Sequence, residues 1–386
     1  MPVELAEVQY DAEFHTATIP LLGTLRAGTS YEVIIPAAVG GPLRQQIGDF
    51  RWSFSTQVPQ ISKREPEPGA EVAAGPRELE VEFSSGIDQA LVNTDIFRLS
   101  RGGTPVELSP QDLDYEAGDE PSVTLEAQLL PGSAYELVVG SQVWGPLGAG
   151  QPDARWSFTT HVPQARQFEP ADSTDVSIEL STIEIFFTHP VDETALKTPG
   201  NVEIFSSGEL IQTADPDYVA QDLKVSFDLE EQLQAGTHYE VRLASGVGGP
   251  LQLEDYTFEF DTAIPAVVLD EVFPPAATTG VEIEALEQVR IPFSAPIDDD
   301  KVTGAHFVLL HEGEKGPLSN DDRPQLLDDR PTYGLEPAAA WQVGSTYTVQ
   351  IAPAVNGPLG MDQTISRQFQ TAVPEVESQN PPDNAT

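Results

Sequence analysis

Three sequence elements recur four times in the same order in this chain of 386 residues, and they limit it to a tandem array of similar domains. The first, Gly-x-x-Tyr, recurs at intervals of 104, 104 and 108 residues and places its tyrosine at Tyr31, Tyr135, Tyr239 and Tyr347. The second, Gly-Pro-Leu, begins at Gly41, Gly145, Gly249 and Gly357. The third, Phe-x-Thr, ends at Thr56, Thr160, Thr262 and Thr371.

A second set of elements is present only three times, and its absence from the start of the chain sets the predicted boundaries. Each copy has a proline, an apolar strand that ends on phenylalanine, and an aspartate five residues beyond it: Pro66, Phe83 and Asp88; Pro170, Phe187 and Asp192; Pro274, Phe293 and Asp298. We therefore predict the C-terminal half of a module at 1–57, complete modules at 58–161, 162–263 and 264–373, and a disordered, apolar-poor tail at 374–386. We call the first four segments the half module and the second, third and fourth modules.

The apolar pattern inside a module is typical of half-buried β-strands. Polar residues separate the apolar side chains of Tyr239, Val241 and Leu243. The 34 Pro and 30 Gly suit many short strands joined by turns. A module of this length matches an immunoglobulin-like sandwich of about seven strands. The predicted fold class is all-β: tandem immunoglobulin-like β-sandwich modules, with the first module truncated to its C-terminal half.

Each repeated tyrosine is predicted to form a tyrosine corner. Its ring is the first inward residue of a strand, and its hydroxyl can bond to a backbone group near the preceding turn. A large apolar residue lies six positions earlier, as Leu129 does before Tyr135, and we interpret it as a core partner. The alternative is a strip of exposed aromatic rings that binds carbohydrate, but the alternation with polar neighbours favours the core.

The connections between modules are short and contain proline. They are Val58-Pro59, Val162-Pro163, Ile264-Pro265 and Val373-Pro374. Proline fixes φ and removes a backbone donor, so we predict semi-rigid joints. With modules roughly 30 Å across, the array is predicted to be a rod on the order of 100 Å long. The Gly-Pro-Leu element is interpreted as a turn that leads into the last strands.

The order of these elements resembles that of a known family. Phe-Ser-Ala-Pro-Ile-Asp at 293–298 comes before a Gly-x-x-Tyr segment, Gly-Pro-Leu and Phe-x-Thr, and in the earlier copies the tyrosine segment reads Leu-x-x-Gly-x-x-Tyr. This order is similar to the bacterial Ig-like domain first described in the S-layer protein SbsA. Looser copies of the first segment lie at 83–88 and 187–192, and the resemblance covers residues 1 to about 373 as tandem copies. A fibronectin type III module shares the tyrosine segment, but the repeat length and the ending favour the bacterial family. The resemblance implies a secreted or cell-surface protein whose domains act as spacers or adhesive stalks, and it implies no catalytic residues.

The composition excludes several classes of function. With 62 Asp+Glu against 19 Lys+Arg the formal net charge is -43, so nucleic acid and anionic membrane surfaces are not expected partners. Without cysteine the chain cannot form disulfides or thiolate metal sites. The sequence has no apolar run as long as a membrane span, and no phosphate loop, nucleophile elbow or HExxH element. We predict that it is not an enzyme and has no cofactor.

Calcium is the one metal candidate, because carboxylates are abundant. The candidate ligands are Asp298, Asp299 and Asp300, with Asp88 and Asp192 at the matching positions of the other modules. Calcium takes about six to eight oxygen ligands from a defined loop, and the EF-hand pattern is absent from the sequence. The alternative interpretation is that these aspartates start a turn after the strand and lie in solvent.

The predicted function is a non-enzymatic, stalk-like or adhesin-like spacer in a bacterial cell-surface or secreted protein. The alternatives are a binding module for glycan, protein or calcium, and an accessory region of a secreted hydrolase. Expected partners are neighbouring modules and other cell-surface components, and the incomplete half module offers a free sheet edge for self-association. We expect an extracellular or cell-surface location, with a signal peptide encoded upstream of Met1.

Overall fold

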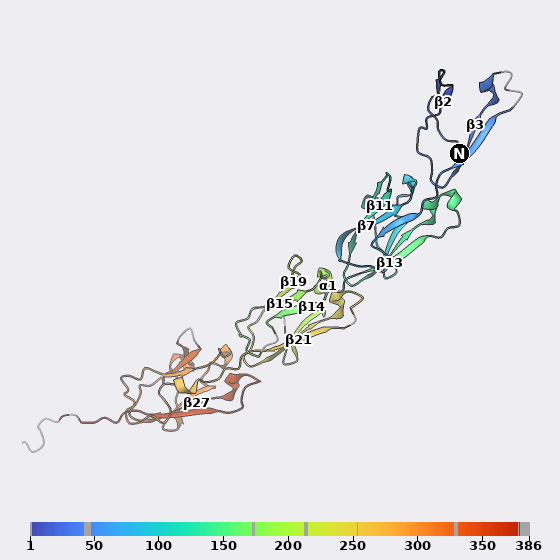
Figure 1. The fold of residues 1–386 in the computed structure, drawn as a ribbon. Coiled ribbons are helices and arrows are strands. Elements are labelled where there is room, and N and C mark those ends of the chain that lie inside the picture. The colour runs from blue at the N-terminus through green and yellow to red at the C-terminus, as the bar shows by residue number, and fades with distance from the viewer. Residues whose placement is uncertain are drawn as a thin grey trace, which may run out of the picture. The chain divides into compact units, whose positions relative to one another are not determined.

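The computed structural model describes residues 2–41, 48–171, 174–211, 215–252, 254–327, 331–376 and 378. The chain divides into two compact units: unit 1 comprises Met1–Gln164, Thr188–Asp192 and Gly248–Leu253, and unit 2 comprises Ala165–Phe187, Glu193–Val247 and Glu254–Thr386. Most regular elements are β-strands and the helices are short (Figure 1), which confirms the all-β, tandem immunoglobulin-like fold class. The disorder predicted for 374–386 falls largely outside the described residues.

The second module, in unit 1, is a sandwich of two sheets. Its strands are β5 Ile61–Glu65, β6 Glu71–Val72, β7 Gly75–Phe83, β8 Phe97–Arg101, β9 Thr104–Pro105, β10 Leu113–Glu116, β11 Ser122–Leu129, β12 Ala134–Val139 and β13 Ala154–Thr160. One sheet has the strand order β10-β11-β7-β5, and the other has the order β6-β13-β12-β8-β9. Only β6 and β13 pair in parallel. The other pairs in the module are antiparallel, so one face of each sheet can pack inward while the other faces water.

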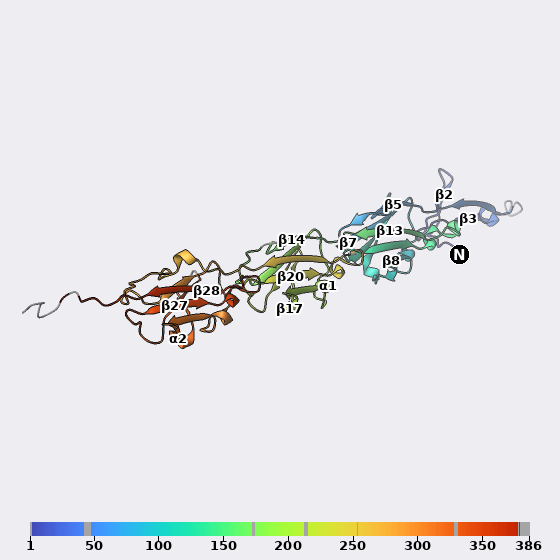
Figure 2. The same ribbon diagram turned by 90° about the horizontal axis from the view of Figure 1, so that it is seen from below.

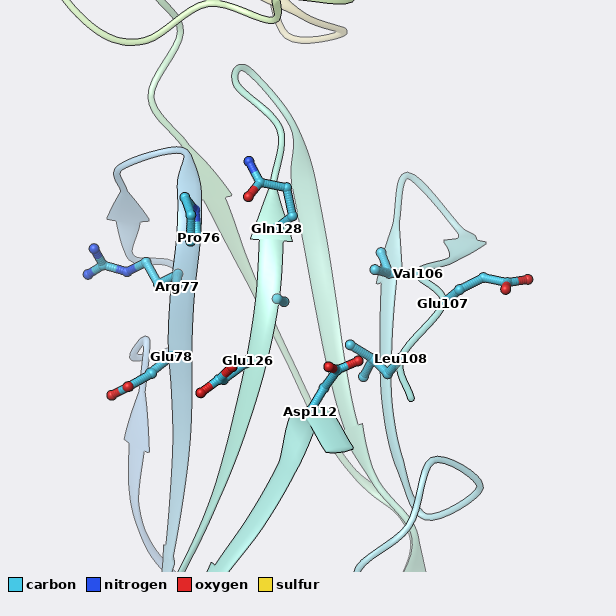
Figure 3. Close-up of a pocket in the computed structure, with 10 residues that line it drawn as sticks. Pro76, Arg77, Glu78, Val106, Glu107, Leu108, Asp112, Glu126 and Gln128 are labelled. Atoms are coloured by element: carbon cyan, nitrogen blue, oxygen red, sulfur yellow. The ribbon is translucent and has the colours of Figure 1, made fainter. Parts of the chain in front are cut away.

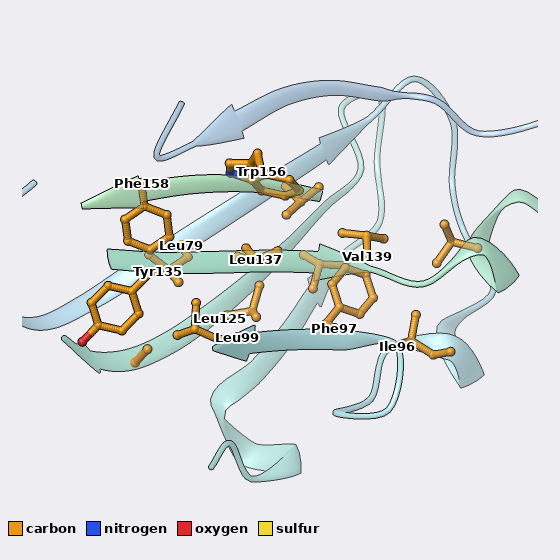
Figure 4. Close-up of a cluster of buried hydrophobic side chains, with 14 of the residues drawn as sticks. Leu79, Ile96, Phe97, Leu99, Leu125, Tyr135, Leu137, Val139, Trp156 and Phe158 are labelled. Atoms are coloured by element: carbon orange, nitrogen blue, oxygen red, sulfur yellow. The ribbon is translucent and has the colours of Figure 1, made fainter. Parts of the chain in front are cut away.

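The core of the second module lies between these two sheets (Figure 4). Leu79 on β7 and Leu125 on β11 belong to one sheet, and Leu137 on β12 and Trp156 on β13 belong to the other. Tyr135 is 1% exposed and stacks on Phe158, with ring centroids 5.4 Å apart. Burial of a large apolar side chain stabilises a fold by about 1.5–3 kcal/mol. The repeated tyrosine is therefore a core residue, and the alternative of an exposed carbohydrate-binding strip is wrong for this module.

Unit 2 contains two further sandwiches. The third module has β14 Ala165–Glu169, β15 Thr182–Phe187, β16 Val202–Ser206, β17 Glu209–Ile211, β18 Asp217–Val219, β19 Lys224–Asp228, β20 His238–Leu243, β21 Tyr256–Asp261 and the short helix α1 Glu193–Leu196. The fourth has β22 Val289–Pro292, β23 Phe307–His311, β24 Glu314–Lys315, β25 Gln325–Leu326, β26 Thr332–Leu335, β27 Thr346–Ile351, β28 Ile365–Gln370 and α2 Ser319–Asp322. The sheet orders are β14-β15-β19-β18 and β17-β16-β20-β21, then β22-β26-β25 and β24-β23-β27-β28. Strands β27 and β28, which carry the fourth Tyr and Phe, run side by side (Figure 2).

The described residues of the half module form four short strands. These are β1 Gln9–Asp11, β2 Thr16–Thr18, β3 Ser30–Ile35 and β4 Phe50–Ser55, in two separate two-stranded sheets. Trp52 on β4 is 40% exposed, whereas its equivalent Trp156 is 5% exposed. The difference arises because no strands equivalent to β5, β6, β7 and β8 cover this face among the described residues.

Short helical turns complete the fold. The 3-10 turns are η1 Ala37–Gly40, η3 Gln89–Leu91, η4 Pro110–Asp112, η5 Ser141–Trp144, η6 Pro146–Gly148, η7 Ser245–Gly248, η8 Leu269–Glu271, η9 Asp299–Lys301 and η10 Pro353–Asn356. Four of them, η1, η5, η7 and η10, lead directly into a Gly-Pro-Leu element. Within the described residues, no helix has both the length and the apolar character needed to cross a membrane.

The predicted tyrosine corner is confirmed in all four copies. The N–H of Leu130 donates to the hydroxyl of Tyr135 across 2.7 Å, and burial raises the pKa of this phenol, which stays neutral. The same bond, at 2.8 to 2.9 Å, joins Arg26 to Tyr31, Gln234 to Tyr239, and Gln342 to Tyr347. Each hydroxyl therefore fixes the start of the turn that precedes its own strand.

Replacing Tyr135 by Phe is expected to destabilise the second module by about 1–2 kcal/mol, because the partly buried N–H of Leu130 loses its acceptor. Hydrogen exchange of the β12 amides measures this loss as a lower free energy of opening. Tyr31→Phe is the matched control: the same bond is exposed there, water can replace it, and the change should be about 0.5 kcal/mol or less. An equal effect in both variants would show that the hydroxyl is not what holds the turn.

Candidate functional site: the joint between modules

The turn that carries the repeated glycine is held by the threonine of Phe-x-Thr. In the third module, Thr262 Oγ1 accepts the N–H of Thr237 at 2.9 Å and donates to the carbonyl of Gln234 at 2.6 Å. Thr237 Oγ1 in turn donates to the carbonyl of Ala235 at 3.0 Å. The corresponding bonds form around Thr56, Thr160 and Thr371. The tyrosine and threonine together give each module a fixed turn at this end.

In unit 2 this fixed turn of the third module is in contact with the Gly-Pro-Leu turn of the fourth. The N–H of Leu359 donates to the carbonyl of Gly236 at 2.8 Å. A Cβ atom on Gly236 would overlap the carbonyl oxygen of Asn356, and one on Gly357 would overlap that of Ala235. Both glycines also have positive φ, +54° and +73°. Only glycine fits at the two positions, because the two backbones touch with no space for a side chain.

Unit 1 contains the same contact twice. The N–H of Leu147 donates to the carbonyl of Gly28 in the half module at 2.7 Å, and a Cβ on Gly145 would overlap the carbonyl oxygen of Ala27. The segment 248–252, which groups with unit 1, places the N–H of Leu251 2.8 Å from the carbonyl of Gly132. We call the glycine of Gly-x-x-Tyr with its turn the acceptor, the Gly-Pro-Leu turn the donor, and their contact the joint.

The repeated aspartate also lies at the joint. Asp298 Oδ1 accepts the N–H of Ala235 at 2.7 Å, directly before the acceptor glycine. Burial raises the pKa of the Asp298 carboxyl, and the bond from Ala235 partly opposes that shift. In unit 1, Asp88 Oδ2 lies 3.7 Å from Nε of Arg26 in the half module, an exposed pair worth little by itself. The interpretation of Asp298 as a solvent-exposed turn residue is incomplete, because its carboxylate connects two modules.

The predicted calcium ligands do not act together in the described contacts. Asp300 Oδ2 pairs with Nζ of Lys301 at 2.6 Å, and Arg323 donates to the carbonyl of Asp299 at 3.0 Å, whereas Asp298 faces the joint. Among the residues that the structure describes, no group of three or more His, Cys, Asp or Glu side chains is arranged to hold a metal. Calcium at Asp298, Asp299 and Asp300 stays a prediction.

A groove of about 860 Å³ opens on the second module (Figure 3). Val106, Leu108 and Ala127 supply its apolar lining, and Glu78 and Glu126 lie beside it on paired strands. These two carboxylates are direct cross-strand partners, an arrangement that costs stability unless a cation lies near them. No sequence pattern indicates this groove, because its lining comes from segments that are separate along the chain.

Gly236→Ala and Gly344→Ala form a matched pair of variants that tests the close contact between the two turns of the joint. Both glycines have positive φ, so alanine strains each backbone by about 1–2 kcal/mol. Only at Gly236 does the added Cβ meet backbone of the next module, which adds about 1–3 kcal/mol of overpacking. We expect Gly236→Ala to speed amide exchange at Leu359, and Gly344→Ala to leave that rate unchanged. Equal rates in the two variants would contradict the joint.

Asp298→Asn and Asp298→Ala separate the hydrogen bond from the charge. Asparagine keeps an acceptor for Ala235, whereas alanine leaves that N–H unpaired and is expected to destabilise unit 2 by about 1–2 kcal/mol at pH 7. Because burial raises the folded pKa of Asp298, wild-type stability should fall as pH rises from the ordinary carboxyl range through that raised pKa. The asparagine variant should lack this decrease in a series of melting curves.

The same variants test calcium. If Asp298 ligates the ion, millimolar calcium should raise the melting temperature of the wild type and not that of Asp298→Ala. No shift in the wild type, or the same shift in Asp298→Ala, would dispose of the calcium site.

Comparison with known proteins places these modules in a family. A model of the bacterial Ig-like domain matches residues 55–160, 161–262 and 261–371. No curated protein matches the chain. A solved fragment of titin is 10% identical over 81% of this chain and 97% of its own, with a TM-score of 0.25.

Two bacterial structures also show low similarity to this chain. The N-terminal part of the S-layer protein SbsC is 15% identical over 54% of this chain and 44% of its own, with a TM-score of 0.22. Fibronectin(III)-like modules of Clostridium thermocellum CbhA are 9% identical over 53% and 94%, with a TM-score of 0.17. Similarities this low carry no argument about function. The three family matches, in contrast, follow one another from residue 55 to residue 371, and the chain therefore belongs to the bacterial Ig-like domain family.

Proposed function

We propose that this chain is a non-enzymatic spacer in a bacterial cell-surface or secreted protein, with modules of the kind first described in the S-layer protein SbsA. Its task is to hold another part of a stalk-like or adhesin-like protein at a distance. The observation that carries this proposal is the joint, in which the backbone of one module bonds directly to the backbone of the next. A joint of this kind supports transmission of position and force along an array.

The joint resists bending for a physical reason. Each one combines a hydrogen bond from leucine to glycine with close contact of two turns, and neither turn has a flexible side chain at the contact. The linker prolines Pro59 and Pro265 are buried, so the connecting peptide is part of the packed structure. Bending a joint therefore requires that the bond break and the turns separate.

The family and the net charge of the chain support an extracellular or cell-surface location. The bacterial Ig-like family and the tandem repetition favour an extracellular or cell-surface protein whose partners are its own neighbouring modules and other surface components. A net charge of -43 favours solubility of such an array and disfavours its association with anionic surfaces.

Ligand binding by the groove of the second module is a second candidate function. The observation in its favour is the apolar lining of Val106 and Leu108 next to the paired carboxylates Glu78 and Glu126. This combination suits a ligand with an apolar body and a positive charge.

The spacer function predicts an extended particle whose stiffness depends on the joint glycines. Small-angle scattering of the full chain should show a maximum dimension on the order of 100 Å, from modules of roughly 30 Å. Gly145→Ala combined with Gly357→Ala should increase flexibility, because each added Cβ overlaps the preceding module within the same unit.

Gly102→Ala combined with Gly313→Ala is the matched control for scattering. These glycines also have positive φ, and no atom lies within 4 Å of their Cβ positions. A wild-type curve of a compact globule, or equal flexibility in both double variants, would overturn the spacer function.

A further inference from the structure

The fourth module ends in an acceptor turn that is fully formed. Gln342 donates to the hydroxyl of Tyr347 at 2.9 Å, and Thr371 Oγ1 accepts from the N–H of Ser345 at 2.9 Å and donates to Gln342 at 2.6 Å. These are the bonds that shape the acceptor turn of the third module around Gly236. The turn at Gly344 therefore has the geometry that receives a donor turn elsewhere in the chain.

This last acceptor is uncovered. Gly28, Gly132 and Gly236 are buried, whereas Gly344 is exposed. Val343 is 47% exposed, although its equivalent Ala235 is 0% exposed. Among the described residues, no backbone N–H is recorded as donating to the carbonyl of Gly344, and a Cβ there would meet only the side chain of Val373, at 3.6 Å.

The linker beside this acceptor is uncovered as well. Val373 is 71% exposed, and Pro374 is exposed, whereas Pro59, Pro163 and Pro265 are buried. An apolar residue followed by proline is the device that joins consecutive modules elsewhere in the chain. At the end of the fourth module the same pair, Val373-Pro374, is exposed to solvent beside the uncovered turn at Gly344.

The sequence beyond this linker continues in the register of a module. Pro381 follows Pro374 by seven positions, as Pro66 follows Pro59 and Pro170 follows Pro163, whereas the corresponding spacing in the fourth module is nine positions. In the second and third modules the residues between these prolines form the opening strands β5 and β14. Residues 377 and 379–386 lie outside the described part of the chain, so their register is a statement about sequence only. This proline spacing suggests that the segment after Pro374 begins a further module, which its composition alone did not indicate.

We propose that the Gly344 end of the fourth module is an acceptor site for a further bacterial Ig-like module that begins at Pro374. The leucine N–H of its Gly-Pro-Leu turn donates to the carbonyl of Gly344, as Leu359 donates to Gly236. The carboxylate of its repeated aspartate accepts the N–H of Val343, as Asp298 accepts that of Ala235. This partner extends the proposed spacer function by naming what one end of the array binds.

A complete module fits this surface better than the start of a second copy of the chain. A second copy presents Gly41-Pro42-Leu43 in its half module, but the sequence of that half contains no strand followed by the repeated aspartate. It therefore offers only one of the two contacts made to the acceptor of the third module. Small ligands offer neither the turn nor the linker.

The test extends the chain by one module. Residues 375–386 are replaced by a copy of 266–373, and in a second protein by a copy of 164–263, so that each added module follows Pro374 in register. Amide exchange at Val343 is compared with that in the original chain. We expect it to slow by about tenfold or more in both extended proteins, because the added aspartate protects this amide. Slow exchange in the last strands of the added copy shows that the copy is folded.

Gly344→Ala supplies the control. In the original chain its Cβ meets only Val373, but in an extended chain it should meet the added Gly-Pro-Leu turn, so Val343 should lose its protection. Unchanged exchange at Val343 beside a folded copy, or failure of both copies to fold after Pro374, overturns the proposal. Scattering by the original chain is independent of this readout, so the spacer function can stand or fall separately.

Discussion

The close contact of two glycine-containing turns is the constraint on which the arrangement of neighbouring modules depends. Gly236 and Gly357 approach until a Cβ atom on either would overlap a carbonyl oxygen of the other turn. A backbone contact of this kind has one geometry, because it contains no rotatable side chain that could adapt. The repeated sequence elements then have a common purpose: they shape, hold or complement these two turns.

The tyrosine, the threonine and the glycine form one structure although they are separate in sequence. The Tyr239 hydroxyl fixes the first residue of the turn, and the Thr262 hydroxyl bonds to both ends of it. Both side chains are buried, which limits the access of water to these bonds. The acceptor turn is thus rigid because side chains of the packed core hold it. In this way the core fixes the backbone conformation at the module boundary.

The two halves of a module contribute different parts of the joint. The acceptor turn and the Gly-Pro-Leu donor both come from the C-terminal half, whereas the aspartate comes from the N-terminal half. This division explains why the half module, with Trp52 and its sheet face exposed, still bonds through Gly28 to the second module. The joint needs the corner around Tyr31 and Thr56, and it does not need a complete sandwich.

The sequence by itself determined the repeat, the alternating strands and the tyrosine corner, because each of these follows from local spacing and from the period of burial. It did not reveal that Gly-x-x-Tyr of one module meets Gly-Pro-Leu of the next, although both recur at matching intervals. It left open whether Asp298 lies in solvent or binds calcium, and it did not reveal that the Asp298 carboxylate accepts a hydrogen bond from Ala235. Only the tertiary structure decided these points, since a repeat period fixes what each module contains but not which turns of neighbouring modules come into contact.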